Sequence, residues 1–115
     1  MPAGVGLALD AAFVLVFAAV GRASHEEGNV LAGLSGTAWP FLVGLGVGWT
    51  AVRLRSHRWP LEVGSGISVV IGTVAVGMLL RALTGQGTAW SFVVVATLVL
   101  AVLLLGWRLL AARVA

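Results

Sequence analysis

The sequence contains no cysteine and no lysine. Without cysteine the chain forms no disulfide, holds no cysteine-ligated iron–sulfur cluster and uses no thiol nucleophile. Charge is scarce as well, since seven arginines and four acidic residues are the only formally charged side chains among 115 residues. About a quarter of an ordinary soluble domain is charged, against 10% of this chain. So few charges cannot cover a water-facing surface, and the soluble globular class is therefore excluded.

Apolar residues make up 60% of the chain, and the mean hydropathy is +1.09. The charged residues are clustered, and the stretches between the clusters approach or reach the roughly 20 residues that a spanning helix needs. We therefore expect an all-α membrane protein whose partner is the lipid bilayer. The expected architecture is a single domain, residues 1–115, that forms a bundle of four transmembrane helices at residues 3–23, 37–54, 60–83 and 88–113.

Two of these helix starts depend on proline. The second helix could begin at Val30, but Ser35-Gly36-Thr37 followed by Pro40 is typical of a capped start, because proline fits a first turn and breaks a helix interior. This pattern favours a start at Thr37. The third helix is expected to begin near Pro60, where proline and the early Glu62 both suit a helix N-terminus.

Arginine also indicates the orientation of the bundle. With four spans, the two termini and the connection between the second and third helices lie on one side of the membrane, and that side holds five arginines against two on the other. Arginine-rich segments stay in the cytoplasm. We therefore expect a multi-pass protein of the cell inner membrane with cytoplasmic N- and C-termini, and dual insertion remains the alternative.

A short segment occurs twice, as GTAWPF at residues 36–41 and GTAWSF at residues 87–92. In both copies the threonine suits a helix cap and the tryptophan suits a membrane interface, so Thr37, Trp39, Thr88 and Trp90 are predicted helix-start anchors. The two expected helices that begin with these segments each also contain a Gly-Trp pair near the other end. The pattern is consistent with two helical hairpins related as parallel repeats, or with coincidence in a chain of strongly biased composition.

Asp10 is the clearest candidate functional residue. It lies inside the first expected span, roughly 10 Å along the helix from residue 3. Ionisable groups at membrane depth are costly and often functional. A carboxylate there requires a partner, which Arg53 or Arg108 could supply. Asp10 could couple transport to an ion or proton, or it could be an interfacial aspartate in a salt bridge or near the helix dipole.

A second polar cluster is expected on the outer side. Its candidate gate residues are Arg22, Ser24, His25, Glu26 and Arg81. The cluster could form such a gate, with His25 titrating near neutral pH, or it could be a set of ion pairs that holds the hairpins together. His25 and His57 lie on opposite sides of a core about 30 Å thick, so they cannot share a ligand in one protomer. We expect no bound metal, haem or other cofactor.

Arg53, Arg55 and Arg58 lie with Trp59 in the expected cytoplasmic connection. They are candidates for binding lipid headgroups, and the alternative is that they serve only as the topology signal. The chain has no glycine-rich phosphate loop, nucleophile elbow or pair of catalytic carboxylates, so we expect no enzymatic activity. The net charge of +3 reflects topology, and nucleic-acid binding is not expected.

Several segments resemble a known family. These are GRASH at residues 21–25, WPF at 39–41, GMLLRAL at 77–83, GTAWSFVVVA at 87–96 and GWR at 106–108. Through these segments the chain resembles a family of small prokaryotic four-helix membrane proteins catalogued only as a domain of unknown function. The resemblance covers nearly the whole chain and implies no activity. Fluoride-channel motifs are not found, and Asp10 matches the helix-1 glutamate of small multidrug transporters only loosely.

The sequence thus favours a channel or transporter for a small ion or solute. Because four helices leave little interior for a pathway and the spans are rich in glycine, a homo-oligomer is expected. The alternative is a structural or assembly subunit without transport activity, in which the polar groups only hold helices together.

Overall fold

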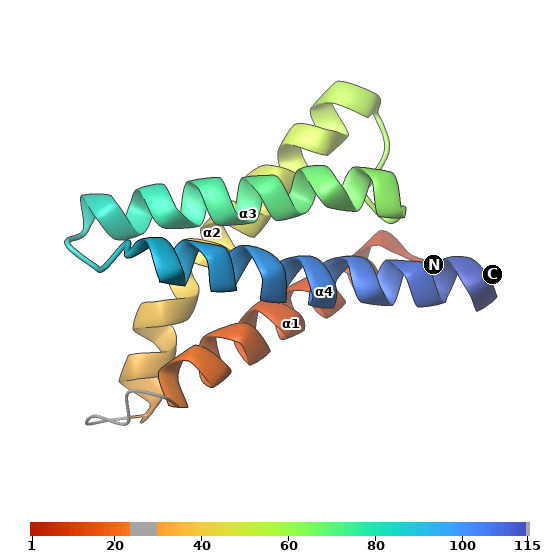
Figure 1. The fold of residues 1–115 in the computed structure, drawn as a ribbon. Helices are drawn as coiled ribbons and strands as arrows, with labels where there is room; N and C mark the ends of the chain where they lie inside the picture. The colour runs from red at the N-terminus through yellow and green to blue at the C-terminus, as the bar shows by residue number, and fades with distance from the viewer. Residues whose placement is uncertain (24–29, 115) are drawn as a thin grey trace.

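Four α-helices make up the fold of the described residues: α1 (Ala3–Ala23), α2 (Val30–Ser56), α3 (Val63–Leu83) and α4 (Trp90–Val114). The computed structural model describes the backbone of residues 1–23 and 30–114, and the side chains within these ranges other than 22–23 and 30–33. Helices α3 and α4 run antiparallel, and α2 crosses α3 at a steep angle (Figure 1). Helix α1 packs against α2 and α4. The two termini lie at the same end of the α3–α4 pair (Figure 1).

Within the part of the chain that the structure describes, three helices are long and apolar enough to cross a membrane: Ala3–Gly21 within α1, Val63–Leu83 and Trp90–Val114. Helix α2 has the length but a lower hydropathy, because its sequence includes tryptophan, threonine and arginine beside its glycines. The surface supports a lipid environment, since large apolar side chains such as Ile71, Val102 and Leu110 are well exposed. Exposed apolar side chains of this size and number are expected where a protein contacts lipid or another protein. The all-helical class and three membrane-length helices are therefore confirmed.

The expected start of α2 is wrong. The helix begins at Val30 rather than at Thr37, so Thr37 and Trp39 lie inside it and Pro40 is an interior residue. Pro40 is buried, and proline inside a membrane helix is tolerated where surrounding protein satisfies the freed backbone groups. The local capping signal was therefore overridden by continuation of the helix.

Two other starts also differ from expectation. Helix α3 begins at Val63, after the N-cap Glu62, and the preceding residues form a turn in which the Leu61 amide donates to the Trp59 carbonyl. Helix α4 begins at Trp90, which leaves Thr88 in the connection. Because Trp90 starts α4 while Trp39 lies well inside α2, the two GTAW copies do not hold equivalent positions. Duplication of a hairpin stays a hypothesis.

The closest helix contact is the crossing of α2 over α3. A methyl group placed on Gly44 would lie 2.6 Å from the Thr73 carbonyl oxygen, and one on Gly72 would lie 3.0 Å from the Gly48 Cα. Glycine at these positions lets the two backbones meet directly, as small residues do in membrane helix pairs. The crossing sets where the C-terminal half of α2 lies relative to the start of α3.

The core lies between all four helices. Phe17 of α1 meets Phe41 of α2 edge to face with ring centroids 5.1 Å apart, and Phe92 of α4 lies 6.1 Å from both rings. Toward the end that holds the two termini, the core continues through buried Leu45, Leu100 and Leu104. This apolar packing leads to a buried polar cluster at that end.

Candidate functional site

Asp10 lies on the face of α1 that packs into the protein. Buried residues recur along this face at Gly6, Asp10, Val14 and Phe17, the spacing of one helical stripe. The stripe is apolar except for Asp10, whose side chain is completely buried. The periodicity that directs α1 into the core therefore also places one carboxylate there.

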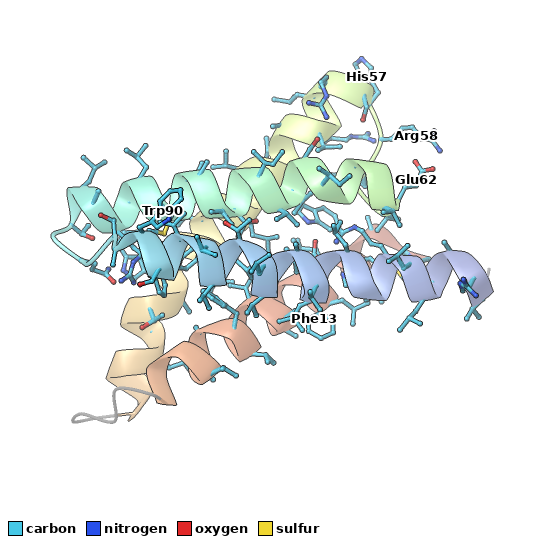
Figure 2. All side chains as sticks on the ribbon, viewed as in Figure 1. Phe13, His57, Arg58, Glu62 and Trp90 are labelled. Carbon is cyan, nitrogen blue, oxygen red and sulfur yellow. The ribbon has the colours of Figure 1, made fainter. Side chains whose placement is uncertain are left out.

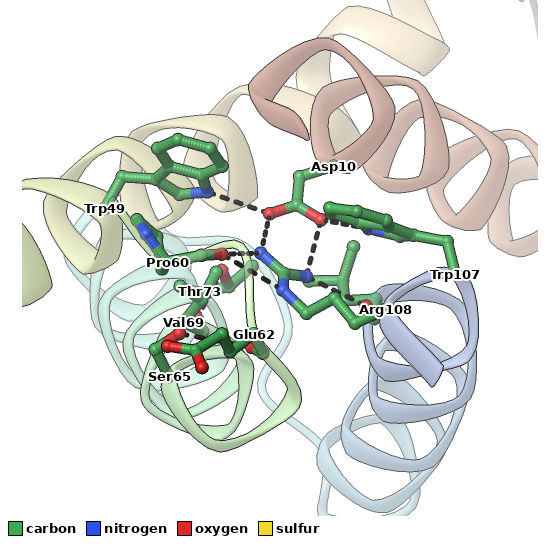
Figure 3. Close-up of polar contacts among 10 residues, drawn as sticks. Asp10, Trp49, Pro60, Glu62, Ser65, Val69, Thr73, Trp107 and Arg108 are labelled. Atoms are coloured by element: carbon green, nitrogen blue, oxygen red, sulfur yellow. Dashed lines mark hydrogen bonds and ion pairs between the residues drawn. The ribbon is translucent and has the colours of Figure 1, made fainter. Parts of the chain in front are cut away.

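Arg108 of α4 is the partner of this carboxylate (Figure 3). Its Nη1 donates to Oδ1 at 2.9 Å and its Nη2 donates to Oδ2 at 2.7 Å, so two parallel bonds join the groups. Such bidentate pairs combine charge attraction with fixed geometry. The Arg108 side chain is also fully buried, and this is the one ion pair within the described residues.

Two tryptophans complete the environment of the carboxylate. The indole Nε1 of Trp49 donates to Oδ2 at 2.8 Å, and that of Trp107 donates to Oδ1 at 2.7 Å. Each Asp10 oxygen therefore accepts one bond from arginine and one from an indole (Figure 3). These tryptophans come from α2 and α4, in the two Gly-Trp pairs of the sequence.

The remaining donors of Arg108 are also used. Nε and Nη2 both donate to the Pro60 carbonyl, at 3.1 and 2.8 Å, and Nη1 donates to the Leu104 carbonyl at 2.8 Å. A guanidinium has five N–H donors, and all five are bonded here. The stem of Arg108 runs over Gly66, where an added methyl group would lie 2.6 Å from Cδ. Gly66 is thus required for the arginine to reach its place.

The cluster connects three helices and the segment before α3 at one end of the bundle. Asp10 belongs to α1, Trp49 to α2, and Arg108 to α4, while the Pro60 carbonyl lies in the connection that leads into α3. Burying two charges costs several kcal/mol per ion unless their geometry and remaining hydrogen bonds are satisfied. Here they are satisfied, so the arrangement is stable only when all four segments are in place.

The sequence singled out Asp10 and offered Arg53 or Arg108 as its partner. The structure selects Arg108; Arg53 instead donates to the His57 carbonyl at 2.7 Å and lies 4.9 Å from the centroid of the Trp59 ring. The roles of Trp49, Trp107 and Pro60 were missed. The only signal for the two tryptophans was the repeated Gly-Trp dipeptide, which is equally typical of an interfacial anchor.

The expected outer gate is described only at Arg81. Its Nε donates to the Gly87 carbonyl at 2.9 Å, its Nη1 donates to Gln86 Oε1 at 3.0 Å, and its guanidinium lies 4.4 Å from the Phe92 ring centroid. Arg81 thus binds the turn between α3 and α4. The other expected gate residues, Ser24, His25 and Glu26 and the side chain of Arg22, lie outside the described residues, and the gate stays a prediction.

The other predicted sites are distributed over the surface. Trp39 is partly exposed, and Trp90 is largely exposed at the first residue of α4 (Figure 2). Arg55 Nη2 donates to Ser68 Oγ at 3.1 Å, which connects the ends of α2 and α3. No group of three potential metal-ligating side chains occurs among residues 1–23 and 30–114.

Removing one indole donor should measurably destabilise the protein. We expect Trp49→Phe to lower the free energy of unfolding by about 1.5–3 kcal/mol, because a smaller aromatic ring remains while one hydrogen bond to a buried charged group is lost. Thermal and SDS-induced unfolding in detergent micelles, followed by circular dichroism, would measure this change. The matched control is Trp90→Phe at an exposed position, where a change within about 0.5 kcal/mol is expected. Equal stability of the two variants would contradict the role of Trp49.

Fold and site together define an all-helical protein with three membrane-length helices and a fully bonded Asp–Arg pair at one end. Within that class the chain belongs to the family described as "Protein of unknown function (DUF3054)", whose model matches residues 7–111. The resemblance to a family of unknown function is thereby confirmed, and the matched range includes both Asp10 and Arg108. No curated protein and no solved structure gives a significant match.

Proposed function

We propose that this protein is a multi-pass integral membrane protein with a structural or assembly role, in which the Asp10–Arg108 pair holds the helices in one fixed arrangement. The observation that carries the proposal is that the pair is completely bonded within the chain. Both carboxylate oxygens accept two hydrogen bonds, and all five guanidinium donors are used. An ion or solute could bind Asp10 only after bonds to Arg108 or the tryptophans had broken.

The proposal includes membrane insertion of all four helices, in the inner membrane, with both termini in the cytoplasm. The arginine distribution supports the orientation. The insertion of α2 is supported by its close packing on α3, because α3 is itself long and apolar enough to span a membrane. Glycines that meet no other part of the chain, such as Gly64 and Gly106, leave room for a second copy to approach closely and so support association into a homo-oligomer. The proposal assigns no enzymatic chemistry to the chain.

Transport of a small ion or solute is the second candidate, and one observation favours it. A charged pair that joins α1 to α4 at membrane depth is expensive compared with apolar packing, and such groups often belong to transport pathways. If the protein transports, the Asp10–Arg108 pair closes one end of the bundle and opens during the transport cycle. The outer gate is then formed by Arg22, His25, Glu26 and Arg81.

Reconstitution into proteoliposomes separates the two candidates. Wild-type protein and Asp10→Asn would be tested for flux across a panel of ions and small solutes, with folding followed by circular dichroism in the same vesicles. A structural role predicts no flux by the folded wild type and a loss of stability in Asp10→Asn. Flux that is present in the wild type and lost in a folded Asp10→Asn variant would overturn the structural role in favour of transport. Arg113→Gln, an exposed change on α4, serves as the control.

A further inference from the structure

The outward face of α2 carries a shallow open groove of about 520 Å³. Its lining is almost wholly apolar, and its one hydroxyl, on Thr50, already donates to the Gly46 carbonyl at 2.8 Å. The floor is open at Gly46, where an added methyl group would meet no atom within 4 Å. The lining residues are Val43, Gly46, Val47, Thr50, Ala51 and Leu54.

The length of the groove corresponds to one leaflet of a bilayer. From Val43 to Leu54 a helix rises about 16 Å, and half of a hydrocarbon core about 30 Å thick is about 15 Å. With Leu54 at the membrane interface, the groove runs from there toward the middle of the bilayer, and it reaches less deep than its length because α2 crosses α3 at a steep angle (Figure 1). An acyl chain from one leaflet would match this length.

Positive charge gathers at the Leu54 end. Arg53 and Arg55 flank Leu54, Arg58 follows in the connection to α3, and all three side chains are exposed. Arg53 comes directly before the lining residue Leu54, and its contacts with the His57 carbonyl and the Trp59 ring hold its guanidinium beside the end of the groove. The Arg58 guanidinium has no hydrogen bond or ion pair with any described residue, and it lies near the tip of the turn after α2 (Figure 2). The only acidic residue of this connection is Glu62.

We propose that this surface binds an anionic phospholipid, with one acyl chain in the groove and the headgroup phosphate on Arg53 and Arg58. The charge at the groove end favours an anionic over a zwitterionic headgroup, because each arginine near a membrane surface adds attraction to anionic lipid. A second copy packed in parallel on this face would place two sets of arginines side by side, which disfavours that occupant. The inference rests on the membrane insertion of α2 in the proposed function and does not depend on whether the protein transports.

Native mass spectrometry of the protein in detergent tests the proposal directly. With equal amounts of phosphatidylglycerol and phosphatidylcholine, we expect a retained phosphatidylglycerol molecule at a several-fold excess. Arg58→Gln should weaken its binding about fivefold, and Gly46→Leu should weaken binding by filling the groove. Arg113→Gln, which removes an exposed arginine of α4, should leave binding unchanged. Inorganic phosphate added as competitor should not displace the lipid, because it lacks the acyl chain.

Several results would overturn the proposal: equal retention of the two lipids, unchanged binding in Arg58→Gln, or displacement of the lipid by inorganic phosphate. Loss of a dimer rather than of lipid in Gly46→Leu would assign the groove to a second copy. Insertion of α2 is tested separately with Val47→Cys, since the chain has no native cysteine. Labelling of Val47→Cys in intact vesicles by a membrane-impermeant maleimide would contradict the four-span proposal. Protection of Val47→Cys without lipid preference would contradict only the lipid site.

Discussion

Arg108→Met should lower the free energy of unfolding by about 3–5 kcal/mol, the usual cost of leaving one member of a buried ion pair without its partner. The substitution keeps an unbranched apolar stem over Gly66 but removes every donor that the guanidinium supplies. Asp10 then retains only the two indole bonds, and the Pro60 carbonyl loses both of its bonds from Arg108. Reversible unfolding in mixed detergent–SDS micelles would measure the change.

A double variant shows whether the loss comes from the unpaired charge. In Asp10→Asn/Arg108→Met the carboxylate is replaced by a neutral amide whose oxygen still accepts from an indole. We expect this variant to recover about 2 kcal/mol relative to Arg108→Met alone, since neighbouring substitutions in one network are not additive. Arg113→Met is the control on the same helix, because Arg113 is exposed. If the double variant were less stable than Arg108→Met, charge burial would not be the cause.

Gly44→Ala should be the most damaging single methyl addition in α2. The new methyl would lie 2.6 Å from the Thr73 carbonyl oxygen and 3.0 Å from the Thr73 Cα. These are backbone atoms, so no side-chain rotation can relieve the contact and α2 must move away from α3. Such overpacking costs about 1–3 kcal/mol and occasionally more, and Gly44→Val should exceed Gly44→Ala.

Gly46→Ala provides the matched control for this prediction. It adds the same methyl to the same helix on the opposite side of the crossing, where nothing lies within 4 Å. No loss is expected there, because alanine has the higher helix propensity by about 1 kcal/mol. The loss of stability in Gly48→Ala should lie between those of the other two variants, because its methyl would lie 3.3 Å from the Val69 Cα. Equal stability of the Gly44 and Gly46 variants, measured by unfolding in micelles, would show that the α2–α3 crossing is not as tight as described.

Sequence reasoning was most successful where a local property decided the outcome. Helix α1 covers the same residues as the expected segment, because a long apolar stretch interrupted only by Asp10 is followed directly by polar residues. It was least successful at Pro40. There the local preference for a first-turn proline competed with continuation of α2 to Val30, and the packing that accommodates Pro40 in a helix interior comes from other parts of the chain.

The candidate site was predictable in part for the same reason. Asp10 could be recognised because a carboxylate within an apolar stretch is conspicuous without any knowledge of the fold. Trp49 and Trp107 could not, since a tryptophan that donates to a buried carboxylate and one that anchors a helix at the interface have the same neighbours in sequence. Which role an indole takes depends on which way its helix faces.

Composition and charge spacing by themselves determined that this chain is helical and membrane-type, since hydropathy and helix length are properties of single segments. They also showed that Asp10 needs a partner. Only the tertiary structure decided that the partner is Arg108 and that two indoles and the Pro60 carbonyl complete the cluster, because these groups lie up to 98 positions from Asp10 in the chain. Their meeting depends on the glycine-permitted crossing of α2 on α3 and on the facing of α1 toward α4, and neither is encoded in any one segment.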